Sequence, residues 1–440
     1  MPAPPSVRAI SRRALLAALA AVPAASAAAM TAGKPARPAK TPAPRPDQRK
    51  GKRLHIAVVG AGAFGGHTAL SLLRAGARVT LLDAWGPGNS RASSGGETRV
   101  IRGVYGPDRV YVEMARRSFE LWHENETRWK KKLYTRTGAL WMLSDAGDYV
   151  KQSIPHLKSL GFGYEELTTE DAAKRWPQIR FEGVKWAFLE KEAGYLLARR
   201  ACEAVVEGFV AEGGEYRQVS VRPGRYAGGE MRGLRLSEGG DLSADAYVFA
   251  CGPWLAQLFP EVGPSFVTPT RQEVFYFGTP EGDSRFLESH MPVWVDVPRF
   301  FYGIPGNERR GFKIADDERG EPIDPTSAER VLSAEALKSA RAWIAFRFPA
   351  LAEAPLLESR VCQYENSPDH HFILDRHPDA SNVWIVGGGS GHGFKHGPAM
   401  GERVAKTVLG QRPIDPFFSL ARLKNAAQAG LRAEEKVRMV

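Results

Sequence analysis

The chain has 440 residues, which is enough for two or three domains with sizeable hydrophobic cores. Its formal net charge of +11 is concentrated in residues 1–53, which hold eleven Lys or Arg and one acidic residue. The rest of the chain is nearly neutral, so the charge does not indicate a nucleic-acid-binding protein. Its three cysteines have no spacing that fits a disulfide framework or a metal site.

Residues 1–29 have the features of an export signal. Arg12 and Arg13 precede an Ala-rich apolar run, and residues 25–27 (Ala-Ser-Ala) provide a small-residue cleavage pattern. This combination resembles a bacterial twin-arginine signal, a route for folded proteins, and predicts export to the periplasm. An Arg-rich organelle-targeting peptide is the alternative. The apolar run is too short to predict a stable membrane span, and residues 30–53, rich in Pro, Lys and Arg, predict a disordered linker.

The next segment has the order strand, glycine turn, helix, strand. Residues 54–59 form an apolar run typical of a buried parallel strand. Residues 68–74 carry apolar side chains at helical intervals, and residues 78–82 predict a second strand. This order is that of a βαβ unit.

Gly60, Gly62 and Gly65 give the turn the spacing G-x-G-x-x-G. The first glycine allows a tight turn, the second lets a diphosphate approach the backbone, and the third lets helix and strand pack closely. Asp83, at the end of the second strand, is placed to accept hydrogen bonds from an adenosine ribose. The segment therefore predicts an ADP-containing cofactor, and a glycine-rich turn that binds nothing is the alternative.

The rest of the chain alternates predicted strands and helices. Residues 91–105 contain three arginines among glycines, which can surround an anionic ligand or form a solvated loop. Strands are expected at 133–143, 186–189, 246–252, 273–277, 299–304, 311–314 and 382–386, and helices at 111–129, 198–209, 329–346 and 398–409, with a helix start at 168–171.

A second glycine run, which includes Gly391 and Gly393, follows the strand predicted at 382–386. It precedes a predicted helix, so its backbone N–H groups can form a second cradle for a ligand. His370, His371 and His377 fit no common metal-site spacing, and we expect no metal.

Several motifs together resemble one family. The chain from about residue 54 to about residue 420 is similar to FAD-dependent amine oxidases of the D-amino-acid-oxidase superfamily, in the group of monomeric sarcosine, N-methyltryptophan and pipecolate oxidases. The motifs are residues 60–65 with Asp83, 96–102 (Gly-Glu-Thr-Arg-Val-Ile-Arg), 250–254 (Ala-Cys-Gly-Pro-Trp), 362–364 (Cys-Gln-Tyr), 371–375 (His-Phe-Ile-Leu-Asp) and 390–395 (Ser-Gly-His-Gly-Phe-Lys).

The resemblance implies an α/β fold, α+β overall, with two domains. A Rossmann-like FAD-binding domain is expected from residues 54–105, 190–262 and 360–425. An inserted substrate domain with an antiparallel sheet is expected from residues 106–189 and 263–359, followed by a C-terminal tail at 426–440.

The resemblance also implies roles for single residues. Cys362 aligns with the cysteine that binds the flavin as an 8α-thioether, and Arg99 with the arginine that assists this linkage. Lys395 belongs to both the cofactor and the substrate sites, and the FAD-binding set comprises Gly60, Gly62, Gly65, Asp83, Arg99, Cys362, Gly391, Gly393 and Lys395.

On the substrate side, Arg102 and Lys395 align with the pair that binds the substrate carboxylate. Two cations hold a carboxylate better than one. Lys313 aligns with the lysine associated with oxygen activation, and Tyr302 and Tyr364 with residues beside the substrate.

The implied reaction oxidises a C–N bond of a secondary or N-substituted amino acid to an imine, and O2 is reduced to H2O2 by a monomeric enzyme. Sarcosine, N-methyl amino acids, pipecolate and glycated amino acids all fit. The alternatives are a flavin-dependent amine dehydrogenase with another electron acceptor and a non-catalytic nucleotide-binding protein.

Two departures from sarcosine oxidase concern the site. Asp317 stands where that enzyme has a histidine, which favours a polar or cationic substrate. Gly95 replaces another histidine just before the 96–102 motif, in the environment expected for the flavin.

Overall fold

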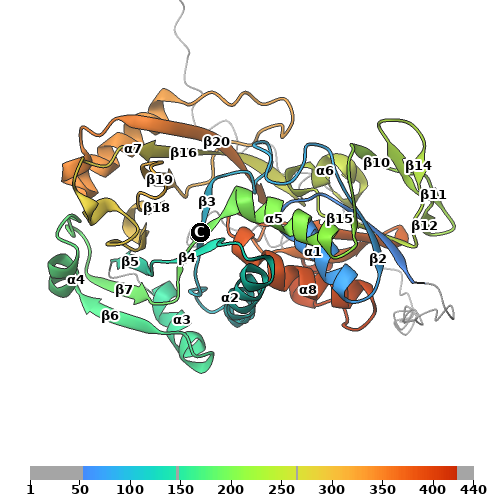
Figure 1. The fold of residues 1–440 in the computed structure, drawn as a ribbon, viewed down its shortest axis with the longest axis horizontal. Helices are drawn as coiled ribbons and strands as arrows, with labels where there is room; N and C mark the ends of the chain where they lie inside the picture. The colour runs from blue at the N-terminus through green and yellow to red at the C-terminus, as the bar shows by residue number, and fades with distance from the viewer. Residues whose placement is uncertain (1–52, 145–147, 264–265, 424–440) are drawn as a thin grey trace, which may run out of the picture. The chain divides into compact units, whose positions relative to one another are not determined.

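A computed structural model describes residues 53–144, 148–263 and 266–423 (Figure 1). The predicted export signal at 1–29, the linker at 30–53 except its last residue, and the tail at 426–440 lie outside the described residues. No helix within the three described ranges is long and apolar enough for a membrane crossing.

A six-stranded sheet contains the predicted βαβ unit. Its order is β21-β22-β15-β1-β2-β9, and every neighbouring pair is parallel except β21 with β22. The bounds are β1 His55–Val59, β2 Arg78–Asp83, β9 Glu215–Gln218, β15 Ala246–Phe249, β21 Ile373–His377 and β22 Ala380–Gly387. This is the open parallel sheet of a Rossmann-like fold.

Both faces of this sheet are covered, which explains why residues 56–59 of its strand β1 are all apolar. Ile56 and Val58 of β1 pack in one core, whereas Ala57 and Val59 pack in another. Helices cover the first face: α1 Ala63–Arg74, α5 Ala198–Ala211 and α8 Gly397–Val408. Small elements cover the second: α6 Leu255–Leu258, β10 Val221–Pro223, β11 Tyr226–Ala227, β12 Glu230–Met231, β13 Leu234–Leu236 and β14 Asp241–Leu242.

An eight-stranded sheet forms the other half of the described chain, on the left in Figure 1. Its order is β20-β16-β19-β18-β17-β5-β7-β6, antiparallel except for the pair β5 and β17. The bounds are β5 Ala139–Leu143, β6 Tyr164–Thr168, β7 Trp186–Glu190, β16 Thr268–Phe277, β17 Val293–Asp296, β18 Phe301–Ile304, β19 Phe312–Asp316 and β20 Leu356–Asn366. The helices of this half are α3 Asp148–Ser159, α4 Thr169–Arg175 and α7 Ala334–Arg347. Helix α2 Arg109–Trp129 packs mainly against α8 and also contacts α3.

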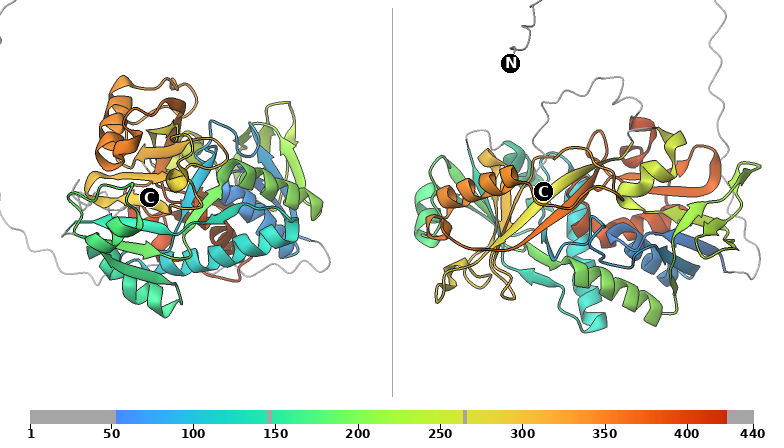
Figure 2. Two further views of the ribbon diagram at one scale, coloured as in Figure 1. Left: turned by 60° about the vertical axis from the view of Figure 1, so that its left-hand side comes forward. Right: turned by 90° about the horizontal axis from the view of Figure 1, so that it is seen from above.

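Strands β16 and β20 connect the two halves. They pair antiparallel over nearly their whole length, with Gln272 opposite Cys362 and Thr270 opposite Tyr364 (Figure 2). The end of β20 contacts the turn Gly252–Trp254 that follows β15 of the other sheet. The eight-stranded sheet therefore carries site residues to the edge of the six-stranded sheet.

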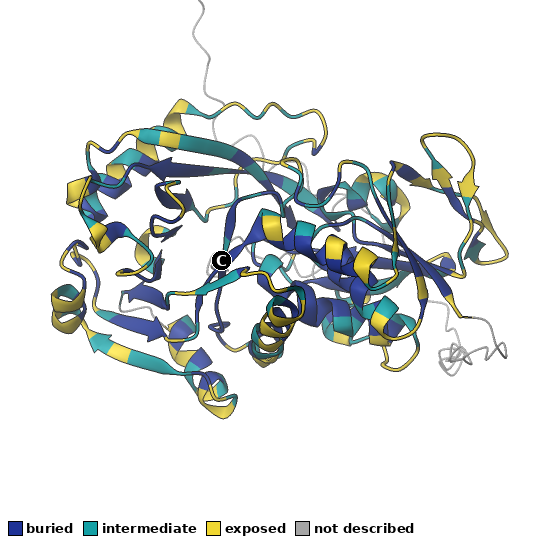
Figure 3. Cartoon of the chain, viewed as in Figure 1, coloured by how far each residue is buried: buried dark blue, intermediate teal, exposed yellow. Residues whose placement is uncertain are grey.

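A three-stranded antiparallel sheet holds the arginine-rich motif. Its order is β3-β8-β4, with bounds β3 Thr98–Ile101, β4 Tyr134–Arg136 and β8 Gly194–Leu197. Figure 3 shows that β3 and β8 are largely buried, whereas the outer side of α2 is exposed. Residues 98–105 of this segment thus lie mostly in the interior and do not form a solvated loop, whereas residues 91–97 are turns and bends in which Arg91 is exposed.

The predicted α/β fold class is confirmed, but two element predictions are wrong. Residues 133–143 are two strands in different sheets, because Gly138 between them has a φ of +77° that a continuous strand cannot contain. Helix α7 begins at Ala334 and not at 329, because the Ser333 hydroxyl caps it by accepting the Ala336 N–H. The helix expected after the glycine turn is α1, which begins at Ala63, directly after the second glycine.

Candidate active site

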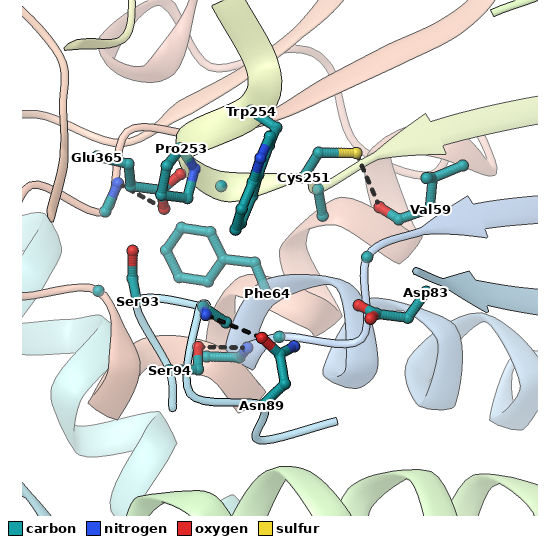
Figure 4. Close-up of a pocket in the computed structure, with 18 of the residues that line it drawn as sticks. Val59, Phe64, Asp83, Asn89, Ser93, Ser94, Cys251, Pro253, Trp254 and Glu365 are labelled. Carbon is teal, nitrogen blue, oxygen red and sulfur yellow. Dashed lines mark hydrogen bonds between the residues drawn. The ribbon is translucent and has the colours of Figure 1, made fainter. Parts of the chain in front are cut away.

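A cavity lies where β1, β15 and β22 end and helix α1 begins (Figure 4). The carboxyl ends of parallel strands are the usual ligand site of such sheets. Several predicted residues line it: Gly60, Gly62, Asp83, Arg99, Tyr364, Gly391 and Gly393. Cys362 lies next to it, on two smaller cavities that Arg99 also lines.

The glycine turn is closed by hydrogen bonds and close packing. The Gly60 N–H donates to Leu82 O over 2.7 Å, and its φ of +104° favours glycine. A Cβ atom there would lie 2.3 Å from Ala250 O. A Cβ atom on Gly65 would lie 1.9 Å from Gly60 O, so only glycine lets α1 pack this closely against the turn.

Asp83 holds the turn from the neighbouring strand. Its carboxylate accepts the N–H groups of Ala61 at 2.7 Å, Trp85 at 2.9 Å and Gly86 at 2.8 Å. Burial raises the pKa of this carboxyl, although the three N–H donors lower it. The sequence predicted a ribose ligand for Asp83, and the structure adds this bracing of the turn.

Arg99 and Cys362 meet beside the cavity. Arg99 Nη2 donates to Cys362 Sγ over 3.4 Å and to Ser93 O over 2.7 Å. Burial lowers the pKa of Arg99, but the Cys362 sulfur and the Tyr302 and Tyr364 hydroxyls raise it above its ordinary value. The guanidinium is therefore a fixed positive charge at this end of the cavity.

Lys313 lies on β19, within the same cluster. Its side chain is fully buried, and Nζ donates to Thr98 O over 2.9 Å. Burial and the charge of Arg99 hold the pKa of Lys313 well below its ordinary value. A lysine of this kind can exchange a proton or respond to a new negative charge nearby.

Tyr302 and Tyr364 extend this cluster toward the second glycine run. Their hydroxyls form a hydrogen bond with each other, and burial raises the pKa of both. Gly391 has a φ of +82°, and a Cβ atom on it would lie 2.7 Å from the Tyr364 ring. The negative charge of Asp317 also raises the pKa of both tyrosines, so Asp317 contributes to the electrostatic potential at this cluster.

Arg102 and Lys395 come together around Tyr105. Lys395 Nζ donates to the Tyr105 hydroxyl over 3.0 Å and to His392 O over 2.9 Å, and the Arg102 guanidinium lies 4.5 Å from the centre of the Tyr105 ring. Both cations are buried. Burial and the charge of Arg102 hold the pKa of Lys395 well below its ordinary value.

Sequence reasoning missed the polar residues that support these cations. His396 Nε2 lies 2.6 Å from the Tyr105 hydroxyl, and Glu190 accepts the Gly103 N–H over 2.6 Å and the Trp141 Nε1–H over 2.8 Å. Tyr105 stands three positions after Arg102, and this closeness was the only signal for it in the sequence.

The profile of the FAD-dependent oxidoreductase family, DAO, matches residues 55–407. The chain belongs to this family. It is 30% identical over 360 residues to a monomeric sarcosine oxidase from Bacillus sp. (strain B-0618), which covers 80% of this chain and 92% of the relative. It is 26% identical over 370 residues to an N-methyl-L-tryptophan oxidase of Salmonella typhi, over 82% of this chain and 97% of the relative.

Two solved structures have the same fold. An L-proline dehydrogenase from P. horikoshii matches with a TM-score of 0.74 and 21% identity, over 85% of this chain and 98% of that one. The fructosamine oxidase Amadoriase II from Aspergillus fumigatus matches with a TM-score of 0.73 and 22% identity, over 86% and 91% of the two chains.

The cavity of this FAD-dependent oxidoreductase fits the cofactor of its family. The glycine turn and the N-terminus of α1 suit a diphosphate, and Asp83 lies where a ribose is expected. Two of the residues that line the cavity each have a buried oxygen without a hydrogen-bond partner in the described part of the chain, Ser93 Oγ and Glu365 Oε2. Such atoms are the kind that a polar ligand satisfies.

Proposed function

We propose that this protein oxidises the C–N bond of an N-substituted amino acid to an imine and passes the two electrons to O2, which becomes H2O2. The observation that carries the proposal is the buried pair of cations, Arg102 and Lys395. Lys395 Nζ donates to two uncharged oxygens, the Tyr105 hydroxyl and His392 O, and among the described residues no carboxylate forms an ion pair with it. A substrate carboxylate between the two cations would relieve their repulsion, so the site favours an amino acid over a simple amine.

In this proposal the bound FAD accepts the electrons, and the protein supplies binding, orientation and charge. Arg102 and Lys395 hold the carboxylate, and Tyr302 and Tyr364 lie beside the nitrogen. Arg99 and Lys313 place positive charge at the other side of the cluster. Fixed charges in a dry site stabilise developing negative charge better than mobile water does.

The relatives and Asp317 narrow the range of amines that we propose as substrates. The two curated relatives are named for sarcosine and N-methyl-L-tryptophan, and the two solved structures for L-proline and fructosamine. Asp317 acts electrostatically on Tyr302, Tyr364 and Lys395, so it favours a substrate with an additional polar or cationic group.

A substrate panel tests the proposed reaction. The purified protein would be given sarcosine, N-methyl-L-tryptophan, L-proline and a fructosyl amino acid, with peroxide release as the readout. Peroxide formation with at least one of them is expected. Flavin reduction without peroxide in air would favour a dehydrogenase that uses another acceptor, and a protein that binds no FAD would contradict the proposal.

We further propose that the flavin is bound covalently through Cys362, as the position of this sulfur beside Arg99 supports. The sequence similarity to a relative named monomeric sarcosine oxidase supports a monomer, which light scattering would test. We also propose export through the twin-arginine route. Cell fractionation would test it, and replacing Arg12 and Arg13 by lysine should keep the protein in the cytoplasm.

A further inference from the structure

Glu365 is a buried acidic residue on the wall of the cofactor cavity. It follows Tyr364 in β20 and is 9% exposed. In Figure 4 its carboxyl lies beside Pro253, at the opposite end of the cavity from Asp83. No motif in the sequence singled it out, and the reaction proposed above does not use it.

The hydrogen bonds of this carboxyl are incomplete. Oε1 accepts the Gly389 N–H over 3.1 Å, but Oε2 has no partner although it is buried. No lysine, arginine or histidine in the described chain forms an ion pair with it. Burial raises the pKa of Glu365 to about 7, opposed only by the Gly389 N–H. Such a group is costly unless something in the functional protein satisfies it.

The backbone around this carboxyl is made of glycine. Cβ atoms on Gly252 and Gly387 would lie 3.4 and 3.5 Å from Oε2, and one on Gly389 would lie 2.8 Å from Oε1. These glycines follow or end β15 and β22, two of the three strands whose ends form the cavity. The carboxyl thus fits among bare backbone at the point where a cofactor chain can approach it.

We propose that Glu365 is a cofactor-binding residue whose free Oε2 accepts a hydrogen bond from a hydroxyl group of the ribityl chain of FAD. In its ionised form the carboxyl only accepts hydrogen bonds, and the diphosphate offers it no donor. Asp83 marks the adenosine end of the cavity, and Tyr364 and Cys362 mark the flavin end. Glu365 adjoins Tyr364, so the hydroxyl-bearing chain next to the flavin is the donor within reach. The inference rests on FAD binding and not on the identity of the amine.

The test measures FAD affinity in the Cys362→Ala protein, so that the cofactor remains exchangeable. Apoprotein would be titrated with FAD and with FAD analogues that each lack one ribityl hydroxyl, and binding would be followed by flavin fluorescence. Glu365→Leu should weaken FAD binding about tenfold or more, as the loss of a buried hydrogen bond does. Ser367→Ala, which removes a buried hydroxyl that does not line the cavity, is the matched control and should bind FAD like its parent.

The analogues decide whether the contact is the proposed one. The analogue that lacks the bonded hydroxyl should bind the protein with Glu365 more weakly than FAD does, by the factor that Glu365→Leu costs for FAD itself. In Glu365→Leu this analogue and FAD should bind with equal affinity. Glu365→Gln, which keeps the volume and an acceptor for the Gly389 N–H, serves if the leucine variant does not fold. If the Glu365 variants bound FAD as tightly as their parent, or if the loss caused by the variant and the loss caused by each analogue simply added, the proposal would be overturned. An absence of FAD binding in the parent would overturn the proposed function as well.

Discussion

The sulfur atom of Cys362 lies 3.4 Å from Nη2 of Arg99, although the two residues stand 263 positions apart in the chain. They come from strands of different sheets, β20 and β3. The guanidinium is held in place by Ser93 O and Thr98 O. The sulfur therefore faces a fixed cation at the edge of the cofactor cavity.

This arrangement predicts an acid-stable flavin that depends on Cys362. After acid precipitation the yellow colour of the wild-type protein should remain in the pellet, and in Cys362→Ala it should pass to the supernatant. Absorbance spectra of both fractions would measure this. Cys251→Ala is the matched control, because Cys251 also lines the cavity but donates to Val59 O over 3.5 Å, and its pellet should stay yellow. Flavin that stays in the pellet of the Cys362 variant would contradict the proposed linkage.

Lys313→Met should slow the reaction with oxygen more than the reaction with substrate. The fully buried amine lies close to Arg99 and Cys362, and its lowered pKa lets it take up a proton when negative charge develops beside it. Removing a preorganised group of this kind costs on the order of 10²- to 10³-fold in rate. Stopped-flow absorbance would measure flavin reduction without oxygen and reoxidation separately. A variant that reoxidises at the wild-type rate would remove Lys313 from the oxygen step. Lys313→Arg keeps a charge and should lose less.

The glycine turn and Asp83 could be predicted from the sequence, because Gly60 and Asp83 belong to one continuous βαβ unit whose spacing sets its geometry. The residues around Arg102 could not be predicted from the sequence. His396 and Tyr105 stand 291 positions apart and meet only because α8 packs against α1 and α2.

Glu365 was overlooked for a related reason. Its carboxyl matters only because β20 ends beside the glycine backbone of β15 and β22, which lies in another sheet. The split of residues 133–143 into two strands has the same origin. The choice of sheet depends on distant strands, β8 for one half and β7 with β17 for the other.

Asp296→Asn should destabilise the eight-stranded half and leave the cofactor site intact. Asp296 and Arg347 form a buried ion pair with Nη2 and Oδ2 2.9 Å apart, and Trp343 Nε1 donates to the same oxygen over 3.0 Å. Removing one charge leaves the other buried and unpaired, which costs about 3–5 kcal/mol of the free energy of unfolding. Urea denaturation would measure it. Asp283→Asn, in a pair with the exposed Arg285 at the surface, is the control and should change stability much less. Equal losses in both variants would contradict this prediction.

Carboxylate binding should weaken as the pH rises, and Lys395 should be the cause. Burial and Arg102 lower the pKa of Lys395 in the free protein, and a carboxylate beside its ammonium would raise it again. Binding then takes up a proton between the two pKa values. The dissociation constant should be flat below the lower pKa, rise about tenfold per pH unit between them, and level off above the higher one.

Butanoate is a suitable probe for this effect, because it matches sarcosine in length but has no nitrogen to oxidise. Changes in the flavin absorbance would report its binding at each pH. In Lys395→Met the affinity at low pH should fall and the pH dependence should disappear. In Lys395→Arg the charge persists at every pH of the titration, so binding should stay flat. His392 and His396 would weaken carboxylate binding in the same direction if they lost a proton in this range, but burial and Lys395 keep their pKa values well below the ordinary range. If the pH dependence survived in Lys395→Met, another group would hold the carboxylate, and the cation pair would lose its proposed role.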